Sequence, residues 1–151
     1  MADVHDPGTR SRNMAAIKGK NTKPEVLLRK NLFSRGFRFR IHRKDLPGKP
    51  DIVLPKFQAA IFVQGCFWHG HRGCPMFRLP ATRRDFWEAK IFSNRERDQR
   101  NIAELRKMGW RVLEVWECAF KGRGRLGDEE LSDLVVSWIN GVSETNQVEG
   151  K

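Results

Sequence analysis

Ten consecutive residues, GCFWHGHRGC at positions 65–74, restrict the folding of this chain more than any other feature. They place two cysteines, two histidines and two large aromatic side chains together, in a stretch without helix or strand periodicity. Thiolates and an imidazole form closed tetrahedral zinc sites with four ligands. The sequence therefore predicts a structural zinc site built from Cys66, Cys74, the distant Cys118 and one histidine.

The spacing does not decide which histidine is the fourth ligand, because His69 and His71 both lie at suitable positions after Cys66. A closed site needs only four ligands, so one histidine remains free. A free imidazole titrates near neutral pH and could act as an acid or a base. The alternative is a loop of buried thiols with both histidines facing solvent.

Helical and extended patterns alternate along the chain, which predicts one three-layer α/β domain around a mixed sheet. The predicted helices span residues 22–36, 82–108 and 128–139, and the predicted strands span residues 37–42, 51–54, 59–63 and 110–116. Segment 59–63 is continuously apolar, so we expect it at the centre of the sheet. We assign residues 1–141 to this domain and expect the polar tail, 142–151, to be frayed.

Each of two threonines precedes an acidic residue by three positions, as in a helix capping box: Thr22 with Glu25, and Thr82 with Asp85. Charged residues of the long helix are expected to form a solvated face. The residues expected to face the core are Val26, Leu27, Leu32 and Phe33 in the first helix, Trp87, Ile91, Ile102 and Leu105 in the second, and Leu131, Leu134, Val135 and Trp138 in the third.

The charge balance favours a polyanionic partner. Lysine and arginine number 29 against 18 acidic residues, which gives a net charge of +11. Such a balance is typical of nucleic-acid-binding proteins, although charge alone does not separate DNA from RNA or binding from cleavage. The N-terminus lacks the apolar segment of a signal peptide, and no apolar run is long enough for a bilayer. We therefore expect a soluble, intracellular protein with no membrane partner.

Asp51 is the strongest catalytic candidate outside the loop, because it follows Pro50 and begins a predicted strand. Hard cations such as Mg²⁺ prefer carboxylate oxygens, although an aspartate after proline is more often a turn residue. The next strand carries no carboxylate, so only a backbone carbonyl or the amide of Gln64 could help it. Glu25 has a simpler role as the capping-box acid. His5 and His42 are expected to be surface residues.

Five segments together resemble the very-short-patch repair (Vsr) endonucleases, a bacterial family similar in fold to the PD-(D/E)XK nucleases. They are MADVHDPGTRSRNM, LPGKPDIV, IFVQGCFWHGH, PATRRDFW and GWRVLEVWECA, and they extend over about residues 1–125. The resemblance implies a cytoplasmic, nucleoid-associated enzyme that recognises a T:G mismatch in double-stranded DNA. It would nick one strand 5′ to the thymine, at mismatches that arise when 5-methylcytosine deaminates.

The resemblance also implies catalytic roles for individual residues. Asp51 and the backbone carbonyl of Val63 would bind Mg²⁺. His69 would help to deliver the attacking water, and Glu25 and Gln64 would assist at the catalytic site. Two of these positions depart from the family pattern, because Gln64 replaces a histidine and Val63 replaces a threonine. Glutamine does not transfer protons at neutral pH, but it can orient a water.

For zinc, the resemblance selects His71 from the two candidate histidines. The implied ligands are Cys66, His71, Cys74 and Cys118. Arg72 and Gly73 separate His71 from Cys74, where the family has a single residue. We expect Gly73 to absorb the additional residue because glycine tolerates unusual backbone angles.

The aromatic residues of the loop gain a role in DNA recognition through the same resemblance. Phe67 and Trp68, with Trp87 opposite them, would insert beside the mismatched pair, which opens at a lower cost than a normal pair. Met14, in the DNA-contacting segment 1–20, would act from the opposite groove. Core packing is the alternative for Trp87. We expect a monomer, with other repair proteins as further partners.

Two alternative functions stay open from the sequence. One is a zinc-stabilised DNA-binding module without catalysis, consistent with the loss of a histidine at Gln64. The other is a nuclease of relaxed mismatch specificity.

Overall fold

A computed structural model describes residues 21–151, so the N-terminal segment with Met14 and His5 lies outside the described part of the chain. Its centre is a five-stranded mixed sheet, with strands β1 and β2 antiparallel to their neighbours and β3, β4 and β5 parallel to one another. In spatial order the strands are β1 (Arg40–Ile41), β2 (Ile52–Leu54), β3 (Ala59–Gln64), β4 (Arg111–Trp116) and β5 (Gln147–Val148).

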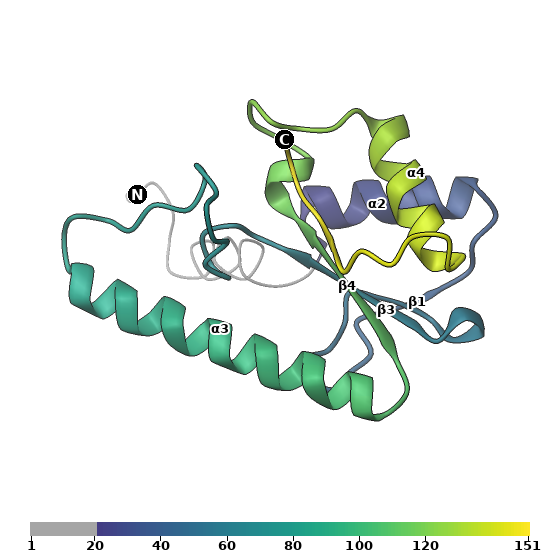
Figure 1. The fold of residues 1–151 in the computed structure, drawn as a ribbon, viewed down its shortest axis with the longest axis horizontal. Helices are drawn as coiled ribbons and strands as arrows, with labels where there is room; N and C mark the ends of the chain where they lie inside the picture. The colour runs from purple at the N-terminus through teal and green to yellow at the C-terminus, as the bar shows by residue number, and fades with distance from the viewer. Residues whose placement is uncertain (1–20) are drawn as a thin grey trace, which may run out of the picture.

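Helices lie on both faces of the sheet (Figure 1). Helices α2 (Lys23–Ser34) and α4 (Asp128–Ile139) cover one face and enclose the larger core. The long helix α3 (Arg84–Lys107) crosses the other face over a smaller core. Two short 3₁₀ helices, η1 (Pro55–Phe57) and η2 (Glu117–Ala119), follow β2 and β4. The prediction of a single α/β domain around a mixed sheet is confirmed, and β3 lies at its centre as expected.

The buried face of α2 differs from the predicted one. Leu28 and Leu32 are fully buried, whereas Phe33 is 56% exposed. Glu25 lies on the same face as these leucines, at helical spacing, and is itself buried. A charged residue at the start of the stripe interrupts its apolar pattern, which is why the sequence pointed to Val26, Leu27 and Phe33 instead.

Three smaller expectations were also wrong. The first strand is only two residues long at the sheet edge, because Phe37 and Phe39 reach the core from irregular backbone. Helix α3 begins after Arg83, which adopts a left-handed conformation and provides no side-chain cap, so Thr82 does not cap it. In α4 the inward position is taken by Ile139 rather than by Leu134, which is 39% exposed.

The end of the chain is not frayed over its last residues. Strand β5 pairs with β4, and Val148 is buried in the main core. The Lys151 amide donates a hydrogen bond to the Gly124 carbonyl. Within residues 21–151, no helix has the length and apolar character that a membrane crossing needs.

Candidate active site and metal centre

The antiparallel pairing of β2 and β3 brings the start of one strand beside the end of the other. Asp51 directly precedes β2, and its Oδ2 atom accepts a hydrogen bond of 2.7 Å from the Val63 amide near the end of β3. The His42 amide, after β1, donates to the Asp51 carbonyl at 3.4 Å. Three strand ends thus meet at one place, and Glu25 of helix α2 joins the side chains of His42 and Asp51 there.

Glu25, His42 and Asp51 form a carboxylate cluster at this place, with one ligand atom from each lying within 4.8 Å of the others. Glu25 is only 1% exposed, and its carboxylate pairs with His42 Nε2 and with Arg29 at 3.2 Å. The Glu25 amide donates to Thr22 Oγ1, so the predicted cap is present. The return bond goes to the Asn21 amide rather than to that of Thr22.

Burial raises the pKa of Asp51 from its ordinary value of 3.8 to about 7, and the nearby charge of Glu25 adds to this effect. The Val63 amide, His69 and Arg29 act in the opposite direction. A carboxyl group in this position gains from a neighbouring cation, because a positive charge stabilises its ionised form. Oxygen donors in this arrangement fit a hard divalent ion such as Mg²⁺.

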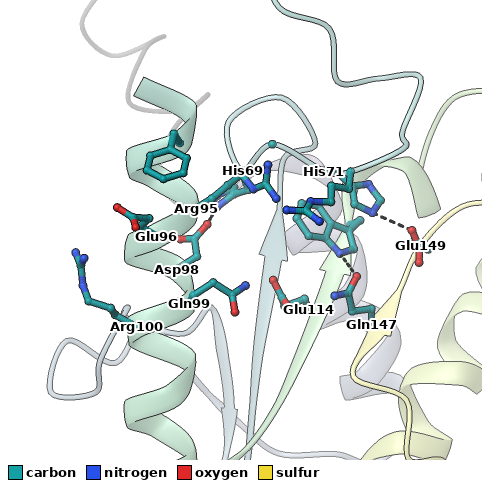
Figure 2. A pocket seen from close by; sticks show the side chains of 14 residues that line it. His69, His71, Arg95, Glu96, Asp98, Gln99, Arg100, Glu114, Gln147 and Glu149 are labelled. Carbon is teal, nitrogen blue, oxygen red and sulfur yellow. Dashed lines mark hydrogen bonds and ion pairs between the residues drawn. The ribbon is translucent and has the colours of Figure 1, made fainter. Parts of the chain in front are cut away.

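His69 lies outside the cysteine-rich site and pairs with an acid from α3. Its Nδ1 atom is 2.6 Å from Asp98 Oδ2, which orients the ring and leaves Nε2 for other partners. His69 and Asp98 line two clefts, one of about 830 Å³ on the β4 side and one of about 450 Å³ on the β3 side. Figure 2 shows the pair at the wall of the larger cleft.

Cys66, His71, Cys74 and Cys118 form a cysteine cluster, with one ligand atom from each lying within 4.8 Å of the others. His71 Nδ1 is 3.5 Å from Cys66 Sγ and 3.6 Å from Cys118 Sγ. The structure therefore places His71, and not His69, with the cysteines. Gly73 has a φ of 69° and open space around it, so the additional residue between His71 and Cys74 is accommodated.

Groups around the cysteine cluster hold its ligands in place. The His71 ring stacks on Trp116 with 3.9 Å between centroids, and its Nε2 atom is 2.8 Å from Glu149 (Figure 2). The Gly150 amide donates to Cys118 Sγ at 3.3 Å. Burial raises the pKa of the Cys66 and Cys118 thiols, so thiolates here need a compensating cation. All three cysteines are free of disulfides, and the donor set is consistent with Zn²⁺.

The loop aromatics gather at the start of α3. Phe67 and Trp68 are in edge contact at 5.1 Å between centroids, and Trp87 approaches Phe67 at 5.5 Å and Trp68 at 5.8 Å. All three rings are partly exposed, and none belongs to the two cores. The core-packing alternative for Trp87 is therefore not supported.

Comparison with known proteins decides the family. The family model for the DNA mismatch endonuclease Vsr matches residues 2–74. The DNA mismatch endonuclease Vsr of Escherichia coli K12 is 48% identical over 149 residues, covering 99% of this chain and 95% of the relative. The chain belongs to the Vsr family of DNA mismatch endonucleases.

Other similar Vsr relatives are nicking enzymes. The type II nicking enzyme V.XorIIP of Xanthomonas oryzae is 51% identical over 126 residues, covering 83% of this chain and 92% of the relative. V.NmeAIP of Neisseria meningitidis is 47% identical over 135 residues, covering 89% and 95% respectively. The resemblance read from the sequence is confirmed, and the chain is a DNA endonuclease of the Vsr type.

Several residues of this Vsr site were missed in the sequence. His42 was expected at the surface, but it pairs with Glu25 in the carboxylate cluster. Asp98 was assigned to the solvated face of the long helix, yet it is only 15% exposed and contacts His69. Glu149 was assigned to a frayed tail, but it contacts His71. No local motif marks these residues, because their partners are 17 to 78 positions away along the chain.

Proposed function

We propose that this Vsr endonuclease recognises a T:G mismatch in duplex DNA and nicks one strand 5′ to the thymine by Mg²⁺-dependent hydrolysis. The main support is the placement of Asp51. Its partly buried carboxyl group lies close to Glu25, and the charge of His69 lowers its pKa. The mismatch and nicking activities in the names of the relatives agree with this proposal. A fold similar to the PD-(D/E)XK nucleases and a monomeric state belong to the same proposal.

Asp51 and the backbone carbonyl of Val63 would hold Mg²⁺. The chemistry supplied by the bound ion is neutralisation of the negative charge that develops on the phosphate. Glu25 supports Asp51 from the N-terminal turn of α2, where Arg29 and His42 fix its carboxylate. This gives Glu25 a role beyond its capping-box geometry.

His69 is suited to take a proton from the attacking water. With Asp98 bound at Nδ1, the neutral ring has its lone pair at Nε2. As the water oxygen bonds to phosphorus, one water proton passes to Nε2. The opposite phosphorus–oxygen bond breaks, and the leaving oxygen takes a proton from solvent. Gln64, at the end of β3 beside His69, is suited to orient this water.

The cysteine cluster would organise the DNA-contacting loop. Phe67, Trp68 and His69 all lie between two of its members, Cys66 and His71. Zn²⁺ bound there would therefore fix the aromatic wedge and the proposed base together. Asn94 of α3 adds to this order, because its amide donates to the Trp68 carbonyl at 2.9 Å.

The wedge of Phe67, Trp68 and Trp87 would enter the duplex at the mismatch, where unstacking costs less than at a normal pair. Stacking of a base on an aromatic ring contributes about 1–3 kcal/mol. Arginines along the exposed side of α3 would contact the phosphate backbone, so binding should weaken steeply as salt rises.

The deciding experiment incubates the full chain and Mg²⁺ with duplexes that carry every mismatch in several flanking contexts. We expect nicking 5′ to the thymine of T:G and little cleavage of matched DNA. Asp51→Ala should abolish nicking while DNA binding stays nearly intact, and equal cleavage by this variant would refute the assignment. Binding without cleavage by the natural chain would indicate a non-catalytic module.

Gln64 gives one specific reason to include the other mismatches. A position that carries histidine in the family pattern carries a residue that does not titrate. Comparable nicking at several mismatches would indicate the relaxed specificity that the sequence left open.

A further inference from the structure

Glu114 is a buried acid that belongs to neither cluster. It lies in the middle of β4 with 8% of its surface exposed, and it faces the α3 side of the sheet. Figure 2 shows its carboxylate entering the larger cleft, opposite Asp98 and Gln99 of α3. A buried acid on a central strand needs an explanation, because charged side chains are rarely buried without a partner.

Gln64, on the neighbouring strand, is a polar neighbour of Glu114. Phe62 is directly opposite Glu114 in the parallel pairing, so Gln64, two residues further along β3, points to the same face. The side-chain amide of Gln64 is close enough to the Glu114 carboxylate to favour its ionised form. Gln64 is 3% exposed, and its Oε1 atom has no hydrogen-bond partner among the described residues.

The planar amide of Gln64 has its nitrogen and oxygen on opposite sides. Because the Glu114 carboxylate attracts the amide nitrogen and repels the amide oxygen, Oε1 is expected to face away from the carboxylate. Gln64 lines the cleft of about 450 Å³ that His69 and Asp98 also line, and Lys44 and Lys49 form part of its wall. An unpaired, buried acceptor beside the proposed base is suited to bind a water in this cleft.

We propose that Glu114 is a positioning residue that keeps the Gln64 carbonyl oxygen turned toward the cleft, where it accepts a hydrogen bond from the water that His69 activates. This inference rests on the proposed function. The water then has two fixed partners, since it donates one proton to His69 and the other hydrogen bond to Gln64. When both hydrogen bonds are fixed, the lone pair of the water that attacks phosphorus has a fixed direction, and such orientation accelerates the attack.

Glu114 acts in this way while it is ionised, because only then does it accept from the amide without competing for Oε1. Burial is the main cause that raises its pKa, and the charge of Asp98 on α3 adds to it. His69, Arg106 of α3 and the Gln64 amide favour the ionised form. The charges that act on Glu114 thus come from α3 and from the loop, and the polar Gln64 amide acts on it from β3.

The test measures single-turnover nicking and duplex affinity for Gln64→Ala, Glu114→Leu, Glu114→Gln and the double variant Gln64→Ala/Glu114→Leu. We expect Glu114→Leu to slow nicking by about tenfold to a hundredfold at unchanged DNA affinity. Glu114→Gln keeps a carbonyl that can accept from Gln64 but adds an amide that can donate to Oε1, so its nicking rate should lie between those of the natural chain and Glu114→Leu. In the Gln64→Ala background, Glu114→Leu should cause no further loss, since its effect passes through Gln64.

Leu113→Ala is the matched control, because Leu113 is the adjacent β4 residue on the opposite face and is fully buried. It should lower the melting temperature without slowing nicking below that temperature. If Glu114→Leu does not fold, Glu114→Met provides the same comparison with a more adaptable side chain. The inference would be overturned if Glu114→Leu nicked DNA at the natural rate. It would also be overturned if the double variant lost more activity than Gln64→Ala alone. A natural chain that fails to nick would instead overturn the proposed function.

Discussion

The cysteine cluster and the carboxylate cluster lie at the ends of neighbouring strands but differ in construction. The cysteine cluster has soft donors that are held from several sides, by Trp116, Glu149 and the Gly150 amide. The carboxylate cluster combines two carboxyl groups with His42, and burial raises the pKa of one of them, Asp51, to about 7. The cysteine cluster favours a permanently bound ion, whereas the carboxylate cluster is suited to an ion that takes part in catalysis.

In this fold, the cysteine cluster mainly serves stability and the carboxylate cluster mainly serves activity. Ligand loss at the cysteine cluster should unfold the loop that carries His69, since the cluster members Cys66 and His71 flank it. Removal of the Asp51 charge should stop catalysis and yet stabilise the folded chain, because burial makes the ionised form of this carboxyl group costly to maintain. Loss of a cysteine-cluster ligand and loss of the Asp51 charge should therefore change the free energy of unfolding in opposite directions.

The largest effect is expected from Cys118→Ser. The change removes a thiolate that joins η2 to the loop, so the protein should lose its zinc and several kcal/mol of unfolding free energy. Zinc content by atomic absorption and thermal melting measure both. A chelator added to the natural chain should reproduce the loss. Unchanged melting temperature and zinc content in the variant would show that the cysteine cluster neither binds zinc through Cys118 nor stabilises the fold through it.

A second effect, of opposite sign, is expected from Asp51→Asn in Mg²⁺-free buffer with zinc retained. The folded-state pKa of Asp51 is raised from 3.8 to about 7, so its contribution to stability is present below pH 4 and is lost as the pH rises through 7. Asparagine stays neutral. At pH 8 the variant should be more stable than the natural chain by roughly 2–4 kcal/mol.

Urea unfolding between pH 4 and pH 8 measures this difference, which should vanish at the acidic end. The same variant should not nick DNA. Equal stability of both chains at pH 8 would mean that the ionised form of Asp51 does not destabilise the folded chain.

A smaller effect should follow from Glu149→Ala. Glu149 contacts the His71 nitrogen that faces away from the cysteines, and such outer partners typically contribute 10- to 100-fold in metal affinity. Competition with a zinc-selective dye measures the change. Glu144→Ala, an exposed acid in the same terminal segment, is the control and should bind zinc normally. Equal affinity in the two variants would remove Glu149 from the site.

The smallest effect separates the two roles of Glu25. Thr22→Ala removes the helix cap and should cost about 1 kcal/mol of stability without changing nicking. Glu25→Gln keeps a side chain of the same shape but removes the charge beside Asp51, so nicking should fall at least about tenfold. Parallel nicking and urea-unfolding assays compare them. If both variants nick normally, Glu25 serves only its helix.

Much of the site could be predicted because its residues lie in short motifs. The loop from Cys66 to Cys74 is contiguous, and the order of strands places Asp51 beside Val63 once β2 and β3 pair. Asp98, Glu114 and Glu149 could not be found in the same way. Each is a single acid among many, and only its neighbour in space distinguishes it from a solvated charge.

The sequence alone determined the α/β class, the central strand, the zinc-type ligand set and the family, because these depend on local spacing and on patterns repeated along the chain. Tertiary structure decided where Glu25 and Glu114 are buried, that Asp98 pairs with His69, and that the chain end docks beside β4. Those outcomes depend on contacts between distant segments. Their free energy comes from packing and pairing that no local pattern records.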